Sequence, residues 1–420
     1  MDIKNKNILV FGVGVSGVSA IKLAKQKGAN VFVMSKGDPS SWNLDVEKNL
    51  YNQDDYSKLP PMDFIILSPG IPRDHEALSL QKKAPIISEI EFAYYFCQTP
   101  IIAITGTNGK TTTVSLLGEM IKRSNKKVFV GGNIGVAFSE YVLGPQQADY
   151  VLLELSSFQL ESIIDFKPQS AAVLNIFANH GERYQGIDDY AQAKARIAMN
   201  MDESAKVWAP SNFKISTKAQ VIKVDLDNVK IDPQFDLSEF KLVGPHNILN
   251  LYFCIEMGKE IGLSYEGMQE AINHFKGVAH RIEFVTDSPL TVYNDAKSTN
   301  LDATMVAVKA VSSSSKNLAL IMGGQLRGRG EELTDSYIED LKSHCSKVYV
   351  IGDASSNLQA QLEKHMNVEN AHTLDQVFNN LEGIDTLLFS PGFPSFDQFK
   401  NYVHRGEVFK ELVASYSKQK

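Results

Sequence analysis

The amino-acid sequence predicts an α/β protein of three domains, and three observations lead to this prediction. Short apolar runs that open into glycine-rich or polar loops alternate with stretches of helical spacing, as in parallel sheets covered by helices. The pattern begins again near residue 98 and once more near residue 280. With 420 residues, the chain exceeds the roughly 250 to 300 residues that one hydrophobic core usually organises.

The first domain, residues 1–97, opens with the apolar run NILVFG at 7–12, which predicts a buried strand. VSAIKLAKQKG at 18–28 has helical spacing and closes with a glycine, and NVFVMS at 30–35 follows as a second strand. DFIILSPGIP at 63–72 is a further strand that runs into a turn. This succession predicts a Rossmann-like domain.

The glycine loop GVGVSG at 12–17 fits GxGxxG after a strand, which alone is weak evidence for dinucleotide binding. NAD binding also needs an acidic residue about 20 positions on, which accepts hydrogen bonds from the ribose hydroxyls. Ser35 and Lys36 stand there instead. A nicotinamide oxidoreductase therefore stays a weaker alternative.

The second domain, residues 98–279, contains GTNGKTT at 106–112 between an apolar strand and an amphipathic helix, the context that a phosphate loop needs. Backbone N–H groups can hold phosphates there, Lys110 can neutralise them, and the Thr111 hydroxyl can bind Mg²⁺. Ile104 stands where GxxxxGK(S/T) has its first glycine, so a simple glycine turn is the alternative. We expect a central ATP-binding sheet of the P-loop ATPase kind.

The third domain, residues 280–420, repeats the pattern of apolar runs that open into loops, as in KVYVIGDAS and DTLLFSPGFPSFD. SPGFP at 390–394 echoes SPGIP at 68–72, which indicates similar strand ends in the two terminal domains. We expect a second Rossmann-like domain, with ligands at the carboxyl ends of its strands.

Composition limits the classes of function. A net charge of −7 and a pI near 5.8 give no overall basic field for nucleic acid. No signal peptide and no run of about 18 apolar residues is present, so we expect a cytoplasmic protein that does not enter a membrane. Cys97, Cys254 and Cys345 match no CxxC pattern and are expected to be ordinary thiols.

From GTNGKTT onward the sequence resembles the ATP-dependent Mur ligases, whose phosphate loop has this shortened form, and the resemblance covers nearly the whole chain. It implies a reaction in which ATP phosphorylates a substrate carboxylate and the amine of an amino acid attacks the acyl phosphate. Two Mg²⁺ sites accompany this reaction in the family. We expect the chain to act as a monomer.

The resemblance also implies the metal ligands. Glu154, in ELSSFQLE after the apolar run YVLLE, would bind Mg²⁺ beside Thr111, and His180 in LNIFANHGERY would bind the second Mg²⁺. Asn179 and Glu182 depart from the aspartates that are common around this histidine. Outside this context, the glutamate would be read as a solvated rim charge and the histidine as structural.

Lys194 lies in YAQAKARIAMN at 190–200, which has the spacing of an amphipathic helix, so it would ordinarily be a surface charge. The resemblance implies that CO₂ carbamylates it. Carbamylation turns a cation into an anion that bears oxygen ligands, which Mg²⁺ prefers.

The resemblance assigns further contacts residue by residue. Arg281 would meet the γ-phosphate, Asp295 the ribose, and Lys297 and Thr299 the reacting end of the substrate, with Lys297 among the catalytic residues. The ATP contacts would be Gly106, Thr107, Asn108, Gly109, Lys110, Thr111, Thr112, Asn247, Asn250, Arg281 and Asp295. The contacts to the UDP-containing substrate would be Gly14, Val15, Ser16, Ser35, Ser68, Pro69, Gly70, Asn133, Ser156 and Gln159, with help from Asn108.

The segment SPGFPSFDQFKNYVHRGEVF at 390–409 resembles the family members that add D-glutamate to UDP-N-acetylmuramoyl-L-alanine during peptidoglycan synthesis. The contacts to D-glutamate would be Thr299, Arg327, Ser395 and Tyr402. Tyr402 replaces the usual phenylalanine, and Leu326 with Arg327 replaces the usual Asp-Lys. A guanidinium keeps the positive charge of lysine but changes the binding geometry.

Two other classes of protein are alternatives. A folylpolyglutamate synthase-like ligase would share the phosphate loop but would not need the N-terminal domain or the DQFKNY segment. A protein that only binds nucleotides would not need Lys110, Glu154, His180 and Lys194 together.

Overall fold

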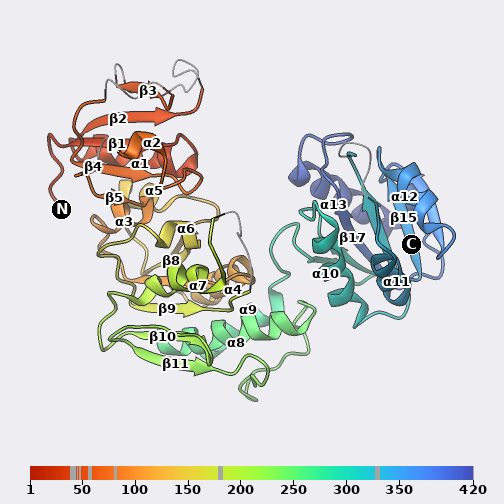
Figure 1. The fold of residues 1–420 in the computed structure, drawn as a ribbon. Coiled ribbons are helices and arrows are strands. Elements are labelled where there is room, and N and C mark those ends of the chain that lie inside the picture. The colour runs from red at the N-terminus through yellow and green to blue at the C-terminus, as the bar shows by residue number, and fades with distance from the viewer. Residues whose placement is uncertain are drawn as a thin grey trace. The chain divides into compact units, whose positions relative to one another are not determined.

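A computed structural model describes residues 1–37, 44, 46, 49–54, 59–79, 83–177, 183–326 and 332–419. The chain forms two compact units, each described by itself. The first unit combines Met1–Pro233 with Leu249–Ala271, and the second combines Gln234–Ile248 with Ile272–Lys420. The units carry three sheets between them, and the predicted α/β class is confirmed (Figure 1).

The first sheet lies in the first unit and has the order β3-β2-β1-β4-β5, with every neighbouring pair parallel. This is the Rossmann order, in which the direction of strand addition switches between β1 and β4. Its elements are β1 (Asn7–Phe11), α1 (Val15–Gln26), β2 (Asn30–Ser35), β3 (Leu50–Asn52), β4 (Phe64–Leu67), α2 (Glu76–Ser79), β5 (Ile86–Ile87) and α3 (Glu89–Tyr94).

Helix α1 begins three residues earlier than the apolar spacing predicts, because the glycine loop already belongs to its first turn. A Cβ atom on Gly17 would lie 1.9 Å from the carbonyl oxygen of Gly12. Only glycine permits this close approach of helix to strand, and it brings the start of α1 to the switch point.

The central sheet also lies in the first unit and has the order β11-β10-β9-β6-β8-β7, again parallel throughout. Its strands are β6 (Ile101–Thr105), β7 (Val128–Gly132), β8 (Tyr150–Glu154), β9 (Ser170–Val173), β10 (Lys206–Pro210) and β11 (Gln220–Val224). Its helices are α4 (Lys110–Arg123), α5 (Phe138–Leu143), α6 (Ser157–Leu160), α7 (Ile187–Ala195) and η2 (Arg196–Ala198). Helices α8 (Pro245–Glu260) and α9 (Tyr265–His274) belong to this unit over Leu249–Glu260 and Tyr265–Ala271.

The two sheets of the first unit share one hydrophobic core. It joins Ile8 and Val10 of β1 to Ile101 and Ala103 of β6, and α5 packs on both α1 and α3. The shared core explains why two of the three predicted domains form a single compact unit. The predicted boundary between residues 97 and 98 stays a prediction.

The third sheet makes up the second unit and has the order β12-β13-β17-β14-β15-β16, in which only β12 is antiparallel to its neighbour. Its strands are β12 (Glu283–Thr286), β13 (Thr291–Asn294), β14 (Leu318–Gly323), β15 (Lys347–Ile351), β16 (Val368–His372) and β17 (Thr386–Gly392). Its helices are α10 (Leu301–Ser312), α11 (Asp335–His344), α12 (Ser355–Leu362), η3 (Gln376–Asn379) and α13 (Tyr402–Gln419).

The remaining sequence expectations concern thiols and membranes. All three cysteines are free; Cys254 and Cys345 are buried and Cys97 is half-buried. Within the described ranges, no helix is both long enough and apolar enough to cross a membrane.

Candidate active site

The predicted phosphate loop, residues 106–112, connects the carboxyl end of β6 to the start of α4. Gly109 caps the helix with φ of +83°, a left-handed conformation that glycine adopts without strain. A Cβ atom there would lie 2.3 Å from Oδ1 of Asn250, so the loop packs closely against α8. The backbone N–H groups at the start of the 14-residue α4 are thereby arranged as in an anion-binding helix N-terminus.

Asn175, just after β9, holds the loop from the other side. Its Oδ1 accepts a hydrogen bond from the N–H of Asn108 at 2.9 Å, and its Nδ2 donates to the Asn108 carbonyl at 3.1 Å. The N–H of Thr107 donates to the Asn175 carbonyl at 3.0 Å. Sequence reasoning did not single out Asn175, although a polar residue directly after an apolar strand was a usable signal.

Lys110 is the first residue of α4 and its side chain reaches back over the loop. Its Nζ donates to the carbonyl oxygens of Gly106 and Thr107 at 2.9 and 2.8 Å. The ammonium therefore lies beside the same loop whose N–H groups would hold phosphate.

Glu154 ends β8 and is buried, with 2% of its surface exposed. Its Oε2 accepts a hydrogen bond from Thr111 Oγ1 at 2.8 Å, and its Oε1 accepts one from Asn133 Nδ2 at 2.8 Å. Two neighbouring ligands of an octahedral Mg²⁺, each about 2.1 Å from the metal, are about 3 Å apart, so Thr111 and Glu154 fit one ion. The predicted pairing of these two residues is therefore present in the geometry.

Lys194 lies near the end of α7 and is buried, with only 1% of its surface exposed, which differs from an ordinary helix charge. Its Nζ is 3.4 Å from Thr105 Oγ1 and lies over the Tyr190 ring, 4.6 Å from the ring centre. Burial and the nearby Lys110 ammonium lower the pKa of Lys194 to about 7, although Glu154 acts in the opposite direction. Within the described ranges, Lys194 forms no ion pair. His180 lies outside them.

Most of the residues predicted to bind the UDP-containing substrate lie at the ends of strands of the first sheet. Gly14, Val15 and Ser16 stand at the start of α1, Ser35 ends β2, and 68–70 follows β4. Parallel strands bring all of them to one edge of the sheet at the switch point, where ligands of such sheets bind.

Ser156 and Gln159 have a structural role that the sequence reasoning missed. They form a capping box at α6: Ser156 Oγ accepts from the N–H of Gln159 at 3.2 Å, and Gln159 Oε1 accepts from the N–H of Ser156 at 3.0 Å. The spacing S-x-x-Q was a readable signal for this arrangement.

The second unit carries the predicted nucleotide contacts Arg281 and Asp295. Asp295 follows β13 and is buried; its Oδ2 accepts from Ser390 Oγ at 2.7 Å and its Oδ1 from the N–H of Ile282 at 3.2 Å. Burial raises the pKa of Asp295 to about 7, although these two hydrogen bonds lower it. Arg281 is exposed.

The predicted catalytic residue Lys297 lies close to Tyr402, a predicted D-glutamate contact. Lys297 Nζ lies 5.5 Å from the centre of the Tyr402 ring, and Tyr402 is the first residue of α13. Ser395 follows β17 and is buried, and Thr299 is half-buried. Arg327 lies outside the described residues.

Asn247 and Asn250 are predicted to contact ATP and lie one turn apart on α8. Asn247 Nδ2 donates to the Val243 carbonyl at 2.7 Å, and both asparagines are buried. Asn250 is the one that packs against the phosphate loop.

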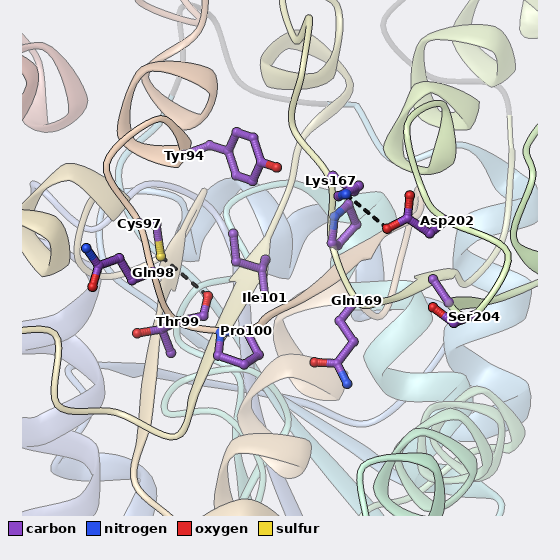
Figure 2. Close-up of a pocket in the computed structure, with 12 residues that line it drawn as sticks. Tyr94, Cys97, Gln98, Thr99, Pro100, Ile101, Lys167, Gln169, Asp202 and Ser204 are labelled. Atoms are coloured by element: carbon purple, nitrogen blue, oxygen red, sulfur yellow. Dashed lines mark hydrogen bonds and ion pairs between the residues drawn. The ribbon is translucent and has the colours of Figure 1, made fainter. Parts of the chain in front are cut away.

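A separate pocket of about 430 Å³ opens at the other edge of the central sheet, where β6 and β10 begin. Figure 2 shows its lining side chains, among them Tyr94, Lys167, Gln169 and Asp202. Lys167 and Asp202 pair with each other at 2.9 Å. The pocket contains no predicted site residue from the described part of the chain, so we place the chemistry at the phosphate loop.

Two protein-family models match the sequence. The Mur ligase middle domain matches residues 104–258, and the Mur ligase glutamate ligase domain matches residues 280–391. A UDP-N-acetylmuramoylalanine–D-glutamate ligase from Thermoanaerobacter pseudethanolicus is 33% identical over 99% of this chain and 99% of its own length. The chain belongs to the Mur ligase family. A Mur ligase of the same description from Koribacter versatilis is 32% identical over 100% of this chain and 99% of its own.

Solved Mur ligase structures share the fold. UDP-N-acetylmuramate-alanine ligase MurC from Thermotoga maritima has 18% identity and a TM-score of 0.56, over 99% of this chain and all of that chain. The MurF ligase from the same organism, in complex with ADP, has 14% identity and a TM-score of 0.55, over 100% of this chain and 96% of that chain. These likenesses support the three-domain Mur ligase fold predicted from the sequence.

Proposed function

We propose that this Mur ligase joins D-glutamate to UDP-N-acetylmuramoyl-L-alanine, using ATP and releasing ADP and phosphate, in the synthesis of peptidoglycan precursors. The observation that carries the proposal is the hydrogen-bonded pair of Thr111 and the buried Glu154 beside the phosphate loop. Relatives that match the chain over its full length are named for this activity. We include a cytoplasmic location and a monomeric state in the proposal.

The first unit supplies the nucleotide and metal groups. The loop N–H groups and Lys110 would bind the ATP phosphates, and the sequence 12–17 with 68–70 would hold the UDP group. Thr111 and Glu154 would hold one Mg²⁺, and His180 with Lys194 the second. Bound there, Mg²⁺ would neutralise phosphate charge and favour transfer of the γ-phosphoryl group to the substrate carboxylate.

The burial of Lys194 supports its predicted modification. Burial without an ion pair in the described ranges disfavours the charged form of a lysine side chain. The uncharged amine, which is the nucleophilic form, is therefore more readily formed. The amine can attack CO₂, forming an N–C bond and releasing one proton, which leaves a carbamate anion. The carbamate would supply the oxygen that a hard cation requires.

The second unit supplies the groups for the incoming amino acid. Thr299, Arg327, Ser395 and Tyr402 would bind D-glutamate and orient its amine for attack on the acyl phosphate. Lys297 would act as a catalytic residue at the reacting end of the substrate. When the amine is held in the correct orientation, its attack on the acyl phosphate becomes an effectively unimolecular step. Asn247, Asn250, Arg281 and Asp295 would complete the ATP contacts.

The alternative classes lose support for specific reasons. An oxidoreductase has no use for the Thr111–Glu154 pair at the end of β8. A protein that only binds nucleotides does not require a buried lysine next to the loop. A folate-directed ligase would not need the Rossmann order of the first sheet, which offers a second nucleotide site.

An amino-acid panel tests the proposal. The purified chain is incubated with ATP, Mg²⁺ and UDP-N-acetylmuramoyl-L-alanine, and phosphate release is followed with D-glutamate, L-glutamate, L-lysine or meso-diaminopimelate. We expect release with D-glutamate alone. Equal release with L-glutamate or meso-diaminopimelate would contradict the assigned specificity.

A further inference from the structure

Arg405 is a buried arginine in the first turn of α13, with none of its surface exposed. Its Nη1 donates to the carbonyl of Phe393 at 3.0 Å, and its Nη2 donates to the carbonyl of Ala296 at 2.9 Å. One planar guanidinium therefore bridges two backbone segments that are almost 100 residues apart in sequence.

Both segments carry predicted site residues. Ala296 follows β13 and immediately precedes Lys297, whereas Phe393 follows β17 and stands two residues before Ser395. Because β13 and β17 are parallel neighbours, these loops emerge at the same edge of the sheet. Arg405 lies where the two loops meet.

A third loop, after β14, passes against the same guanidinium. A Cβ atom on Gly324 would lie 3.2 Å from Nη1 of Arg405 and 2.3 Å from the Pro394 carbonyl. The N–H of Gln325 donates to that carbonyl at 2.9 Å. The ends of three strands, β13, β14 and β17, therefore meet around Arg405.

The placement of Arg405 is electrostatically unfavourable for stability alone. A cation in the first turn of a helix opposes the positive end of the helix dipole. Burial lowers the pKa of the guanidinium to about 10, although Asp397 and Asp295 favour its charged form. Within the described ranges, Arg405 forms no ion pair, and its Nε has no hydrogen-bond partner. An apolar residue of similar volume would commonly serve stability as well as this cation.

We propose that Arg405 is a positioning residue for the amino-acid substrate: it fixes the loops that carry Lys297 and Ser395 by bridging the Ala296 and Phe393 carbonyls. Its buried charge also adds positive potential at the edge where a dicarboxylate would bind. This inference rests on the proposed function, and it goes beyond it because no contact between Arg405 and substrate is required.

Two variants separate positioning from charge and from stability. Arg405→Lys keeps the cation but cannot donate to both carbonyls in the geometry of the planar fork, and Arg405→Met keeps the apolar volume without donors. Lys347→Met is the matched control. Lys347 starts β15, at the opposite end of the strands, and pairs with Glu369 at 2.6 Å while its side chain is 11% exposed.

The measurement is full steady-state kinetics with each of the three substrates varied, together with the thermal unfolding midpoint. For both Arg405 variants we expect the KM for D-glutamate to rise by about tenfold or more, with the KM values for ATP and the UDP-containing substrate within about twofold of wild type. Lys347→Met is expected to lower the unfolding midpoint without changing the KM for D-glutamate.

Several outcomes would overturn the inference. A wild-type KM for D-glutamate in Arg405→Lys would show that the planar guanidinium is not needed. If Arg405→Met does not fold, the result for Arg405→Lys alone decides the test. A lower unfolding midpoint with all KM values unchanged would make Arg405 purely structural. Wild-type protein without D-glutamate-dependent turnover would instead refute the proposed function, and the inference with it.

Discussion

The Thr111 hydroxyl and the Glu154 carboxylate meet at 2.8 Å, although 43 residues separate them. The parallel register of β6 and β8 places Ile104 beside Glu154, so the loop after β6 leaves the sheet next to the end of β8. Asn133 holds the other carboxylate oxygen at 2.8 Å. The pair is fixed by the sheet and by hydrogen bonds, as expected of preorganised metal ligands.

Glu154→Gln should retain the fold and lose most of the activity. The amide has nearly the shape of the carboxylate but no negative charge for Mg²⁺, which costs several kcal/mol of charge stabilisation and about 100-fold or more in kcat. The test combines Mg²⁺ titrations of the rate with thermal unfolding. Glu119→Gln, on the same α4 but in a surface pair with Arg123, is the control and should stay near wild type. Equal Mg²⁺ dependence in Glu154→Gln and wild type would remove Glu154 from the metal site.

Lys110→Ala should reduce ATP turnover by about 10² to 10³, because it removes one charged donor at the transferring phosphates. The unfolding midpoint should change little, because the Lys110 ammonium bonds carbonyl oxygens of a half-buried loop. Lys122→Ala, in the last turn of the same helix and exposed, is the matched control. A rate close to wild type in Lys110→Ala would mean that the phosphate loop has been misinterpreted.

Lys194→Ala should be inactive and should recover part of its rate when short carboxylic acids are added. Removal of the buried side chain leaves space that such an acid can fill, restoring an oxygen ligand for the second Mg²⁺. Lys194→Arg should not respond, because a bulky cation occupies that space. Full activity of Lys194→Ala without added acid would show that Lys194 is not part of the metal site.

Glu89→Gln should become more stable than wild type as the pH rises. Glu89 is buried on α3, its Oε1 accepts from the N–H of Ser139 at 2.5 Å, and burial raises its pKa to about 7 from 4.5. The stability that comes from this raised pKa is present below pH 4.5 and is lost as the pH rises through about 7. A neutral glutamine avoids this loss, so the variant should stay close to wild type in acid.

Unfolding midpoints measured between about pH 5 and pH 8 test the behaviour of Glu89. The difference between Glu89→Gln and wild type should grow through this range and level off above about pH 7. A difference that stays constant across the range would show that Glu89 ionises as it does in the unfolded chain.

The fold followed closely from the sequence because its signals are local. Each apolar run that ends in a glycine loop is a parallel strand of the structure, and GTNGKTT lies between a strand and a helix as its spacing predicts. The start of α1 was harder to predict, because the contact between Gly12 and Gly17 depends on tertiary packing rather than on apolar periodicity.

The site was less predictable, since several of its features depend on residues distant in sequence. The burial of Lys194 and the contacts of Asn175 and Arg405 arise only when strands from separate segments align. The roles predicted for His180 and Arg327, which lie outside the described residues, stay predictions. Ser156 and Gln159 show the reverse case, because their capping box was readable from local spacing.

Product analysis tests the central proposal most directly. The chain is incubated with ATP, Mg²⁺, UDP-N-acetylmuramoyl-L-alanine and D-glutamate, and both the nucleotide product and phosphate are quantified. We expect the mass of the UDP-containing substrate to increase by one glutamyl residue, with one phosphate released for each product molecule. Phosphate release without this product, or an equal yield of product from L-glutamate, would contradict the assignment.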